Sequence, residues 1–409
     1  MFNRREETFP PVYGAIQLEE KKLEAEVAPY VVSMRRFFHE NPELSGREAG
    51  TAERIRKELT EAGIPWKPCG KKLGTGTVAT IVGGAPGKTF MIRADIDALP
   101  IEEKSGVPFS SRAPGVMHAC GHDCHAAMLL GAARILWQER SSLRGTVKLL
   151  FQPAEETAEG ALDMIADGAL DGVDAIFGMH VGSSIPSGRA TVHPGPKSAA
   201  TDWFRVKFTG ESGHAAKPEE CIDVAPAVAT FVLDLQTIRS RETDPFEPVV
   251  VTVGTIRSGS RWNVTSGEAV VEGTIRCYSP EVRTRAEKSV ERIAKETAAA
   301  YRCSAETEVK RLCDPVVNDP AVTEVARRAI ESVLGPAALF PETRNMGGED
   351  FGFYSTRIPA AFAHLGVRNE ACGAVYPQHS DRYRVDESAL AKGALIHAAA
   401  VRLFLNGSL

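Results

Sequence analysis

The stretch HAAMLLGAARILW (125–137), followed by GTVKLLFQPA (145–154), decides the fold of the first half of the chain. The first segment has the apolar spacing of a buried helix, and the second is an apolar run of strand length. Two further strand-like segments, KTFMIRADI (88–96) and DAIFGMHV (174–181), stand on either side of this pair. Strands that alternate with helices are typical of an α/β layer with a largely parallel sheet. In such sheets ligands bind beyond the carboxyl ends of the strands, so chemistry is expected there.

A different order of elements begins near residue 198. The hydrophobic patterns predict, in chain order, a strand, a helix, two strands, a long helix and a last strand over 203–210, 224–238, 248–256, 268–278, 281–301 and 306–312. This β-α-β-β-α-β order is the split βαβ unit of ferredoxin-like folds. We therefore expect an α/β fold of two domains, with 198–312 inserted between the parts 1–197 and 313–409. The charged, weakly patterned residues 1–28 predict a loose arm that leads into a helix.

Composition and charge narrow the class of protein. With 409 residues, 43% hydrophobic and 25% charged, the chain has an ordinary soluble composition, which excludes collagen-like, coiled-coil and largely disordered proteins. The net charge of -5, with no long basic run, argues against a nucleic-acid partner. No apolar stretch is long enough for a membrane span, and the N-terminus lacks the apolar core of a secretory signal. Eight cysteines are too sparse for a disulfide scaffold, so we expect a reduced, cytoplasmic protein.

The segment MHACGHDCH (117–125) is the densest group of candidate metal ligands. It holds three histidines, two cysteines and an aspartate within nine positions. Thiolate, imidazole and carboxylate groups are the ligands of zinc and similar ions. Gly115 and Gly121 bracket the group in a loop ahead of a helix. A structural zinc knuckle is an alternative, but it needs a second ligand pair at short spacing, such as C-x-x-C, which this sequence lacks.

Two adjacent carboxylates, Glu155 and Glu156, follow the buried strand that ends near residue 152. Because neighbouring side chains diverge, one can ligate a metal while the other faces a water molecule beside it. A metal lowers the pKa of such a water, and a nearby carboxylate can take its proton and return it to a leaving group. The alternative is a charged helix start in EETAEG (155–160).

Two more histidines stand at positions where ligands are expected. His180 closes an apolar strand, and His379 lies in a polar loop ahead of the last helix. Either residue alone would be unremarkable, as a core or a surface histidine. Together with the other candidates they make one thiolate, three imidazoles and a carboxylate, too many for one tetrahedral ion with an open position. Two ions that share a bridging ligand fit this set better.

Further segments extend the pattern over nearly the whole chain: HENPEL (39–44), RADIDALP (93–100), the cluster around Cys120, PAEE (153–156), GHAAKP (213–218), GTIR (273–276), GGEDF (347–351) and HSD (379–381). In this order and combination they resemble the M20 metallopeptidases. Within that family they look like the branch of N-acyl-amino-acid amidohydrolases that includes hippurate hydrolases, aminoacylases, auxin-conjugate hydrolases and bacterial thermostable carboxypeptidases.

The resemblance implies a centre of two divalent ions, zinc, manganese, nickel or cobalt, bridged by the cysteine and held by Cys120, His122, Glu156, His180 and His379. It also implies that Glu155 is the general base and later the acid, and that Asp95 orients the site. His118 and His125 match no ligand position. We expect His118 to support the ligands and His125 to be an ordinary helix residue.

The resemblance further implies that the inserted domain is a lid and dimerisation domain. Its His214 would reach an active site, often that of the partner subunit, and polarise the scissile carbonyl. Asn263, Arg276 and Gly348 would bind substrate, although Arg276 could simply pair with a carboxylate. We therefore expect a homodimer or dimer-based oligomer that acts on a small-molecule substrate.

The expected reaction is metal-dependent hydrolysis of the amide bond of N-acyl-amino acids. One alternative is a metal-dependent carboxypeptidase or dipeptidase that cleaves short peptides. Another is a thiol redox or metal-sensing protein built on Cys120 and Cys124, which would leave the two glutamates without a role. The sequence departs from the family pattern at Arg261-Trp262 and at Lys217-Pro218-Glu219-Glu220, so the choice of substrate cannot be carried over directly.

Overall fold

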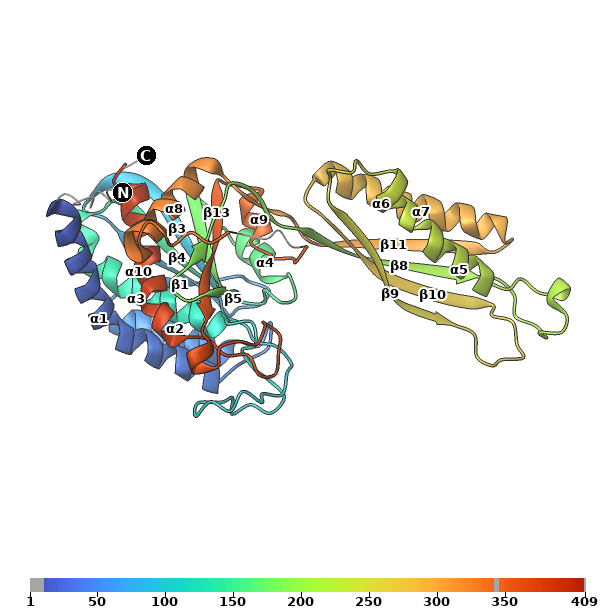
Figure 1. Cartoon of the computed structure of the whole chain (residues 1–409), viewed down its shortest axis with the longest axis horizontal. Helices are drawn as coiled ribbons and strands as arrows, with labels where there is room; N and C mark the ends of the chain where they lie inside the picture. Colours follow the sequence, from blue (N-terminus) through green and yellow to red (C-terminus); the bar gives the residue numbers. More distant parts are fainter. Residues whose placement is uncertain (1–10, 342–345, 408–409) are drawn as a thin grey trace, which may run out of the picture. The chain divides into compact units, whose positions relative to one another are not determined.

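The computed structural model describes residues 11–341 and 346–407, which fall into two compact units (Figure 1). The first unit runs to Gly195, resumes at Val317 and resumes again at Arg357. The second holds Pro196–Val316 together with residues 346–356. A short segment from beyond residue 313 thus groups with the inserted unit. The short strands β7 (Gly195–Ser198) and β12 (Val316–Asn318) lie where the chain passes from one unit to the other.

The described residues of the first unit form a seven-stranded sheet in the order β1-β2-β4-β3-β5-β13-β6. The strands are β1 (Trp66–Cys69), β2 (Gly76–Val82), β3 (Ala85–Asp95), β4 (Arg144–Gln152), β5 (Ala175–Pro186), β6 (Ala190–Thr191) and β13 (Ala360–Arg368). The central strands β4, β3, β5 and β13 are parallel, and antiparallel pairs flank them. The predicted α/β fold is confirmed. Burial of the central strands explains their near-continuous apolar runs.

Helices cover this sheet (Figure 1). They are α1 (Pro11–Glu40), α2 (Ala49–Glu61), α3 (His122–Glu139), α4 (Gly160–Ala166), α8 (Pro320–Leu334) and α10 (Leu390–Leu405). The helices α3 and α10 pack on β3 and on each other, and α1 packs against both. The expected loose arm over 1–28 is wrong from Pro11 onward, where α1 begins; residues 1–10 lie outside the described part. The exposed pair Lys22 and Glu26, one turn apart at 3.9 Å, supports the early part of α1. From Val27 onward an apolar stripe of Val27, Val31, Met34 and Phe38 packs into the core.

One helical segment, Glu387–Leu405, is long and apolar enough to cross a membrane by length and composition. However, 78% of that window is buried inside the protein, as expected for a core helix. Its α10 portion packs against α1, α3 and α8. The apolar character of this helix is therefore accounted for by the core of the first unit.

The described residues of the second unit form a four-stranded antiparallel sheet in the order β11-β8-β10-β9. Its strands are β8 (Ala200–Thr209), β9 (Val249–Ser258), β10 (Glu268–Cys277) and β11 (Ser304–Cys313), and its helices are α5 (Ala225–Asp234), α6 (Gln236–Arg241), α7 (Pro280–Ala300) and α9 (Gly352–Ser355). Phe204, Phe208 and Phe231 anchor a core between sheet and helices. The predicted β-α-β-β-α-β order is confirmed, except that the first predicted helix is split at Leu235.

Candidate metal centre

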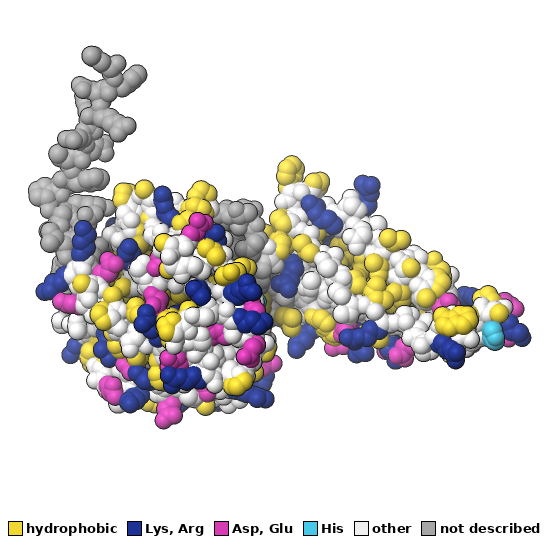
Figure 2. Space-filling view, turned by 60° about the horizontal axis from the view of Figure 1, so that its bottom comes forward, with side chains coloured by type: hydrophobic (Ala, Val, Ile, Leu, Met, Phe, Trp, Pro, Cys, Tyr) yellow, Lys and Arg dark blue, Asp and Glu magenta, His cyan; other side chains and the backbone are white. Residues whose placement is uncertain are grey.

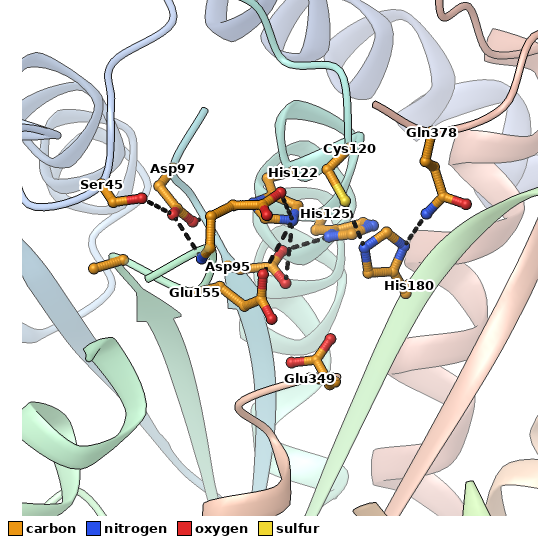
Figure 3. A network of polar contacts seen from close by, with 12 residues as sticks. Ser45, Asp95, Asp97, Cys120, His122, His125, Glu155, His180, Glu349 and Gln378 are labelled. Atoms are coloured by element: carbon orange, nitrogen blue, oxygen red, sulfur yellow. Dashed lines mark hydrogen bonds and ion pairs between the residues drawn. The ribbon is translucent and has the colours of Figure 1, made fainter. Parts of the chain in front are cut away.

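The candidate ligands meet at the carboxyl ends of three neighbouring parallel strands. Asp95 ends β3, Glu155 follows the end of β4, and His180 lies in β5. The first turn of α3 brings His122 to the same place (Figure 3). Because β4, β3 and β5 are adjacent and run in the same direction, residues from distant parts of the sequence converge there.

The backbone is strained in the loops that carry the ligands. Gly121, between Cys120 and His122, has a φ of 97°, and a Cβ there would lie 2.5 Å from a methyl group of Val181. Only glycine fits this position. Ala154, just before the two glutamates, and His379 itself also have positive φ, 51° and 65°. Such strain persists where the surrounding structure fixes the conformation, and it gathers at functional sites.

Cys120, Glu156 and His379 form one potential ligand set, with one ligand atom from each residue within 4.8 Å of the others. The distance between His379 Nε2 and Glu156 Oε1 is 3.6 Å. The backbone N–H of His379 donates to the carbonyl of Ala119 at 2.8 Å, which ties the last loop to the cysteine loop. A thiolate, a carboxylate and an imidazole in this arrangement suit a divalent transition metal.

Cys120 also contacts a second potential set, which consists of Asp95 and three histidines, His122, His125 and His180. Its Sγ lies 3.4 Å from His180 Nε2. His122 Nε2 lies 3.9 Å from Glu156 Oε1, and neither of these two buried atoms has a hydrogen-bond partner among the described residues. Buried polar atoms without partners are costly unless something satisfies them, and a cation between them would do so. The side chains therefore offer ligand atoms for more than one divalent ion.

Asp97, which the sequence reasoning missed, is the carboxylate that orients His122. Its Oδ1 bonds to His122 Nδ1 at 3.1 Å, and its Oδ2 accepts from Ser45 Oγ at 2.6 Å and from the Glu156 N–H at 3.1 Å. This bond directs the Nε2 of His122 toward the ligand cluster. Asp95, expected to orient the site, lies 3.8 Å from His122 Nε2 and makes its hydrogen bonds elsewhere. The alternation Asp95-Ile96-Asp97 was the available signal, because residues two apart in an extended chain share a face.

Glu155 lies at the rim of the cluster (Figure 3). Its Oε2 is 4.0 Å from His122 Nε2, and only 12% of its side chain is exposed. Both adjacent glutamates approach His122 Nε2, Glu155 at 4.0 Å and Glu156 at 3.9 Å, and Glu156 also lies 3.6 Å from His379 Nε2. A carboxylate in this place can exchange a proton with a water molecule or a substrate nitrogen at the centre.

Comparison with known proteins agrees with this geometry. The family model of peptidase family M20/M25/M40 matches residues 91–403. This chain belongs to the M20 family. It is 39% identical over 378 residues to the N-acetyl-L-cysteine deacetylase of Bacillus subtilis, covering 91% of this chain and 88% of that protein. It is 38% identical over 384 residues to thermostable carboxypeptidase 2 of Saccharolobus solfataricus, covering 93% and 97%.

A solved structure from Bacillus subtilis, described as a dinuclear metal binding peptidase from the M20 family, has a TM-score of 0.83 and 34% identity, covering 94% of this chain and 99% of that one. Membership of the M20 family makes this chain a metal-dependent hydrolase of the amidohydrolase and peptidase type. A redox or metal-sensing role for the cysteines is not needed to explain the cluster. The group of Cys120, Glu156 and His379 and the neighbouring group of Asp95, His122, His125 and His180 agree with a dinuclear centre.

Burial sets the protonation of the M20 centre before metal binds. It raises the pKa of the Cys120 thiol above its ordinary value, so a metal must displace a proton from the sulfur. Burial opposes the charged form of His122, but the negative charge of Asp95 and the hydrogen bond to Asp97 outweigh it and raise the pKa of this imidazole. Metal binding at this centre therefore competes with protons.

His118 and His125 differ from expectation in opposite ways. His118 is buried, and its two ring nitrogens bond to no other group in the described part of the chain, so it does not hold a ligand by a hydrogen bond. Burial lowers its pKa to about 4 and keeps the ring neutral. His125 was expected to be an ordinary helix residue, but it bonds to Asp95 and to the backbone of Val181.

In the second unit, His214 and Asn263 lie together. His214 pairs with Val264 in an isolated β-bridge, and the N–H of Ala215 donates to the carbonyl of Asn263 at 3.2 Å. The His214 side chain is exposed. These loops stand where β8 ends and β10 begins.

Arg276 and Gly348 lie together at the opposite end of the same sheet. Arg276 Nη1 donates to Thr201 Oγ1 at 2.9 Å, and a Cβ on Gly348 would lie 2.4 Å from that hydroxyl. Burial lowers the pKa of Arg276, and its nearest partners are the hydroxyls of Thr201 and Thr274. Eight residues of β10 separate the two ends, roughly 27 Å. The structure therefore places the four expected residues of this unit in two separate pairs.

Proposed function

We propose that this protein hydrolyses the amide bond between an acyl group and the amino group of an amino acid. The observation that carries the proposal is the place of Glu155, whose Oε2 lies 4.0 Å from His122 Nε2 and which groups with His122 and Glu156 beside Cys120 and His379. The family relationship to the N-acetyl-L-cysteine deacetylase supports an N-acyl-amino acid as substrate.

In the proposed reaction Cys120, His122, Glu156, His180 and His379 would hold the two ions. Zinc, manganese, nickel and cobalt all suit this donor set. When bound, such ions supply a water of lowered pKa and polarise a carbonyl oxygen. Asp97 keeps His122 directed at the centre through the bond at 3.1 Å.

Glu155 carries the proton from one side of the reaction to the other. It accepts a proton from the attacking water as the new C–O bond forms at the acyl carbon. It then gives that proton to the amide nitrogen as the C–N bond breaks. The products are a carboxylate and a free amino acid, so one water is consumed for each amide cleaved.

We further propose that the second unit is a lid and dimerisation domain, and that His214 acts on the centre of the partner subunit. His214 stands roughly 27 Å from the end of the sheet at which the chain enters and leaves the unit, which favours action in trans. The edge strand β9 is rich in β-branched residues and leaves Ile256 half exposed, a pattern that invites pairing. Hydrophobic side chains also gather on the face of this unit seen in Figure 2.

The proposed compartment is the cytoplasm. The eight cysteines, all within the described residues, form no disulfide. Free thiols, one of them a ligand, suit a reducing compartment. The proposed partners are a small-molecule substrate and a second copy of the chain.

A carboxypeptidase or dipeptidase activity is the second candidate, favoured by the 38% identity to thermostable carboxypeptidase 2. The two activities differ in which side of the amide is recognised. Substrates with a blocked carboxylate and peptides of increasing length separate them. An acyl-amino-acid hydrolase should respond most to the acyl group, and a carboxypeptidase should accept longer peptides that keep a free carboxylate.

The test is amine release from N-acetyl-, N-benzoyl- and longer-chain N-acyl-amino acids and from dipeptides. The protein is stripped with a chelator and reconstituted with Zn²⁺ or Mn²⁺. Metal-dependent turnover of an N-acyl-amino acid is expected, with less turnover of dipeptides. Turnover confined to peptides would favour the second candidate, and no turnover by a folded protein that binds two ions would refute both.

A further inference from the structure

His125 bonds through both ring nitrogens, and each bond leads to a different strand. Its Nδ1 bonds to Asp95 Oδ1 at the end of β3. Its Nε2 accepts a hydrogen bond from the backbone N–H of Val181 in β5 at 2.9 Å. Both His125 and Asp95 are buried. One side chain thus ties the first turn of α3 to the carboxyl ends of two strands.

This bonding pattern fixes the proton on His125. Because the N–H of Val181 donates to Nε2, that nitrogen presents a lone pair, so the proton lies on Nδ1 and is donated to Asp95. Burial lowers the pKa of His125, which keeps the ring neutral. The other oxygen of Asp95 accepts from Arg93 Nη1 at 2.7 Å. The chain Arg93–Asp95–His125–Val181 therefore has one consistent arrangement of donors and acceptors.

We infer that His125 is a positioning residue for His180, the proposed metal ligand that precedes Val181. The N–H held by His125 belongs to the peptide bond between His180 and Val181, so the bond sets the backbone of the ligand itself. The Val181 carbonyl then accepts from His180 Nδ1 at 2.8 Å. With that proton engaged, the Nε2 of His180 faces Cys120 Sγ at 3.4 Å.

His125 does not itself serve as a ligand. Asp95, His122, His125 and His180 do offer ligand atoms within 4.8 Å of one another. However, both nitrogens of His125 and both oxygens of Asp95 already make buried hydrogen bonds. A cation bound by either residue would break a buried hydrogen bond, which is costly to leave unmade. The inference rests on the proposed two-metal centre, but it adds a residue outside the ligand set.

The test is titration of the metal-free protein with Zn²⁺ alone, read by competition with a chromophoric chelator and by metal content per chain. In His125→Phe the ring volume is kept and both bonds are lost. We expect the site that contains His180 to weaken by about tenfold or more, as is typical when a partner of a ligand is removed. The other site should keep its affinity. His125→Gln, which retains an acceptor for the Val181 N–H, should fall nearer to wild type.

Matched variants assign the affected site. The His125→Phe titration should follow that of His180→Ala and differ from that of His379→Ala. His397→Phe is the control, because His397 is also a buried histidine of the first unit and packs on Phe177, in α10 instead of the ligand loops. It should bind Zn²⁺ as wild type does.

The outcomes are distinct. Unchanged binding at both sites in His125→Phe would overturn the inference, and so would equal weakening of both sites, which would mark a general structural role. If His125→Phe does not fold, Asp95→Asn decides. The oxygen of the new amide stays with the donor Arg93 Nη1, so its nitrogen donates to His125 Nδ1. The ring proton then moves to Nε2, where it opposes the N–H of Val181. The same selective loss is expected there, and wild-type binding would overturn the inference. Fewer than two ions on the wild-type protein would instead refute the two-metal centre itself.

Discussion

The ligand cluster of the first unit and the candidate residues of the second are built in opposite ways. In the cluster, buried hydrogen bonds fix the side chains: Asp97 holds His122, and the Val181 carbonyl holds His180. In the second unit the His214 side chain is exposed, and its Nδ1 accepts from the nearby N–H of Ala216 at 3.1 Å. The first region draws its candidate ligands from one unit and holds them by buried hydrogen bonds. The second region presents its histidine on an exposed loop.

This difference shows which part of the proposed site is preorganised: the candidate metal ligands are, and His214 is not. The candidate ligands of the first unit are already held by buried hydrogen bonds. Under the proposed function, closure or dimerisation brings His214 to a substrate. Substitutions in the cluster should therefore change chemistry or metal content directly, whereas substitutions around His214 should change turnover without changing the metals.

Replacement of the proposed base should have the largest effect. In Glu155→Gln the turnover number should fall about 100- to 10,000-fold, the range of a general acid–base group, because the amide cannot accept the proton of water. Metal content should stay at two ions per chain. The matched variant Glu156→Gln should instead lose metal, since its oxygen lies 3.6 Å from His379. Activity retained by Glu155→Gln would show that another group is the base.

Removal of His214 should come next. His214→Ala should lower the turnover number about 100-fold or more, the usual cost of a donor that stabilises a developing oxyanion. Zn²⁺ binding and thermal stability should match wild type, because the side chain is exposed. Lys217→Ala, in the same loop and paired with Glu220 at 3.0 Å, is the control and should keep its activity. A loss of metal in His214→Ala would break the contrast between the regions.

Much of this contrast could be predicted from sequence, and its limits are physical. Glu155, His180 and His122 each lie at or after the end of a predicted strand. Their meeting could be predicted, because the carboxyl ends of parallel strands lie at the same edge of a sheet. The count of donors favoured two ions that share a ligand, and the resemblance to the M20 family implied that this ligand is Cys120. Residue type alone could not distinguish the role of Asp97 from that of Asp95, because both are carboxylates. In the same way it could not distinguish His125 from His122. Only the bonds made in the folded state distinguish ligand, orienting carboxylate and positioning histidine.

The distance between Asn263 and Arg276 in the second unit could have been predicted from the sequence. Asn263 precedes the strand 268–277 and Arg276 nearly ends it, so a strand of ten residues must hold them apart. The grouping of the segment 346–356 with the second unit could not have been predicted, because it depends on contacts distant in sequence.

Acid should weaken the folded state of the first unit through its buried histidines. Burial lowers the pKa of His397 to about 3, from an ordinary value near 6.5. Between about pH 6.5 and pH 3, His397 is protonated in the unfolded chain but neutral in the folded chain. The free energy of unfolding therefore decreases as the pH is lowered through this range. Between pH 7 and pH 5 the loss from this residue should be about 2 kcal/mol. Urea unfolding of metal-free protein at both values should show a correspondingly smaller loss in His397→Phe; an equal loss would contradict the assignment.

Trp262 should give the smallest effect. It is 89% exposed in the loop that carries Asn263, beside His214. Trp262→Ala should leave the free energy of unfolding nearly unchanged. It should shift the preference between N-acetyl and N-benzoyl substrates about threefold to tenfold, because the indole would make apolar contact with an acyl group bound near this loop. Phe246→Ala, 94% exposed in the loop that precedes β9, should leave that preference unchanged. Equal preferences in both variants would place the substrate elsewhere.

The most direct measurement joins the two regions across a dimer. Glu155→Gln and His214→Ala chains are co-expressed with different tags, and heterodimers that carry both tags are purified and loaded with metal. If His214 serves the partner's centre, each heterodimer keeps one intact site and one doubly defective site, so it should show about half of the wild-type activity. A heterodimer no more active than its two parent homodimers, or a doubly tagged complex that never forms, would contradict the proposal that the centre of one chain is completed by His214 of the other.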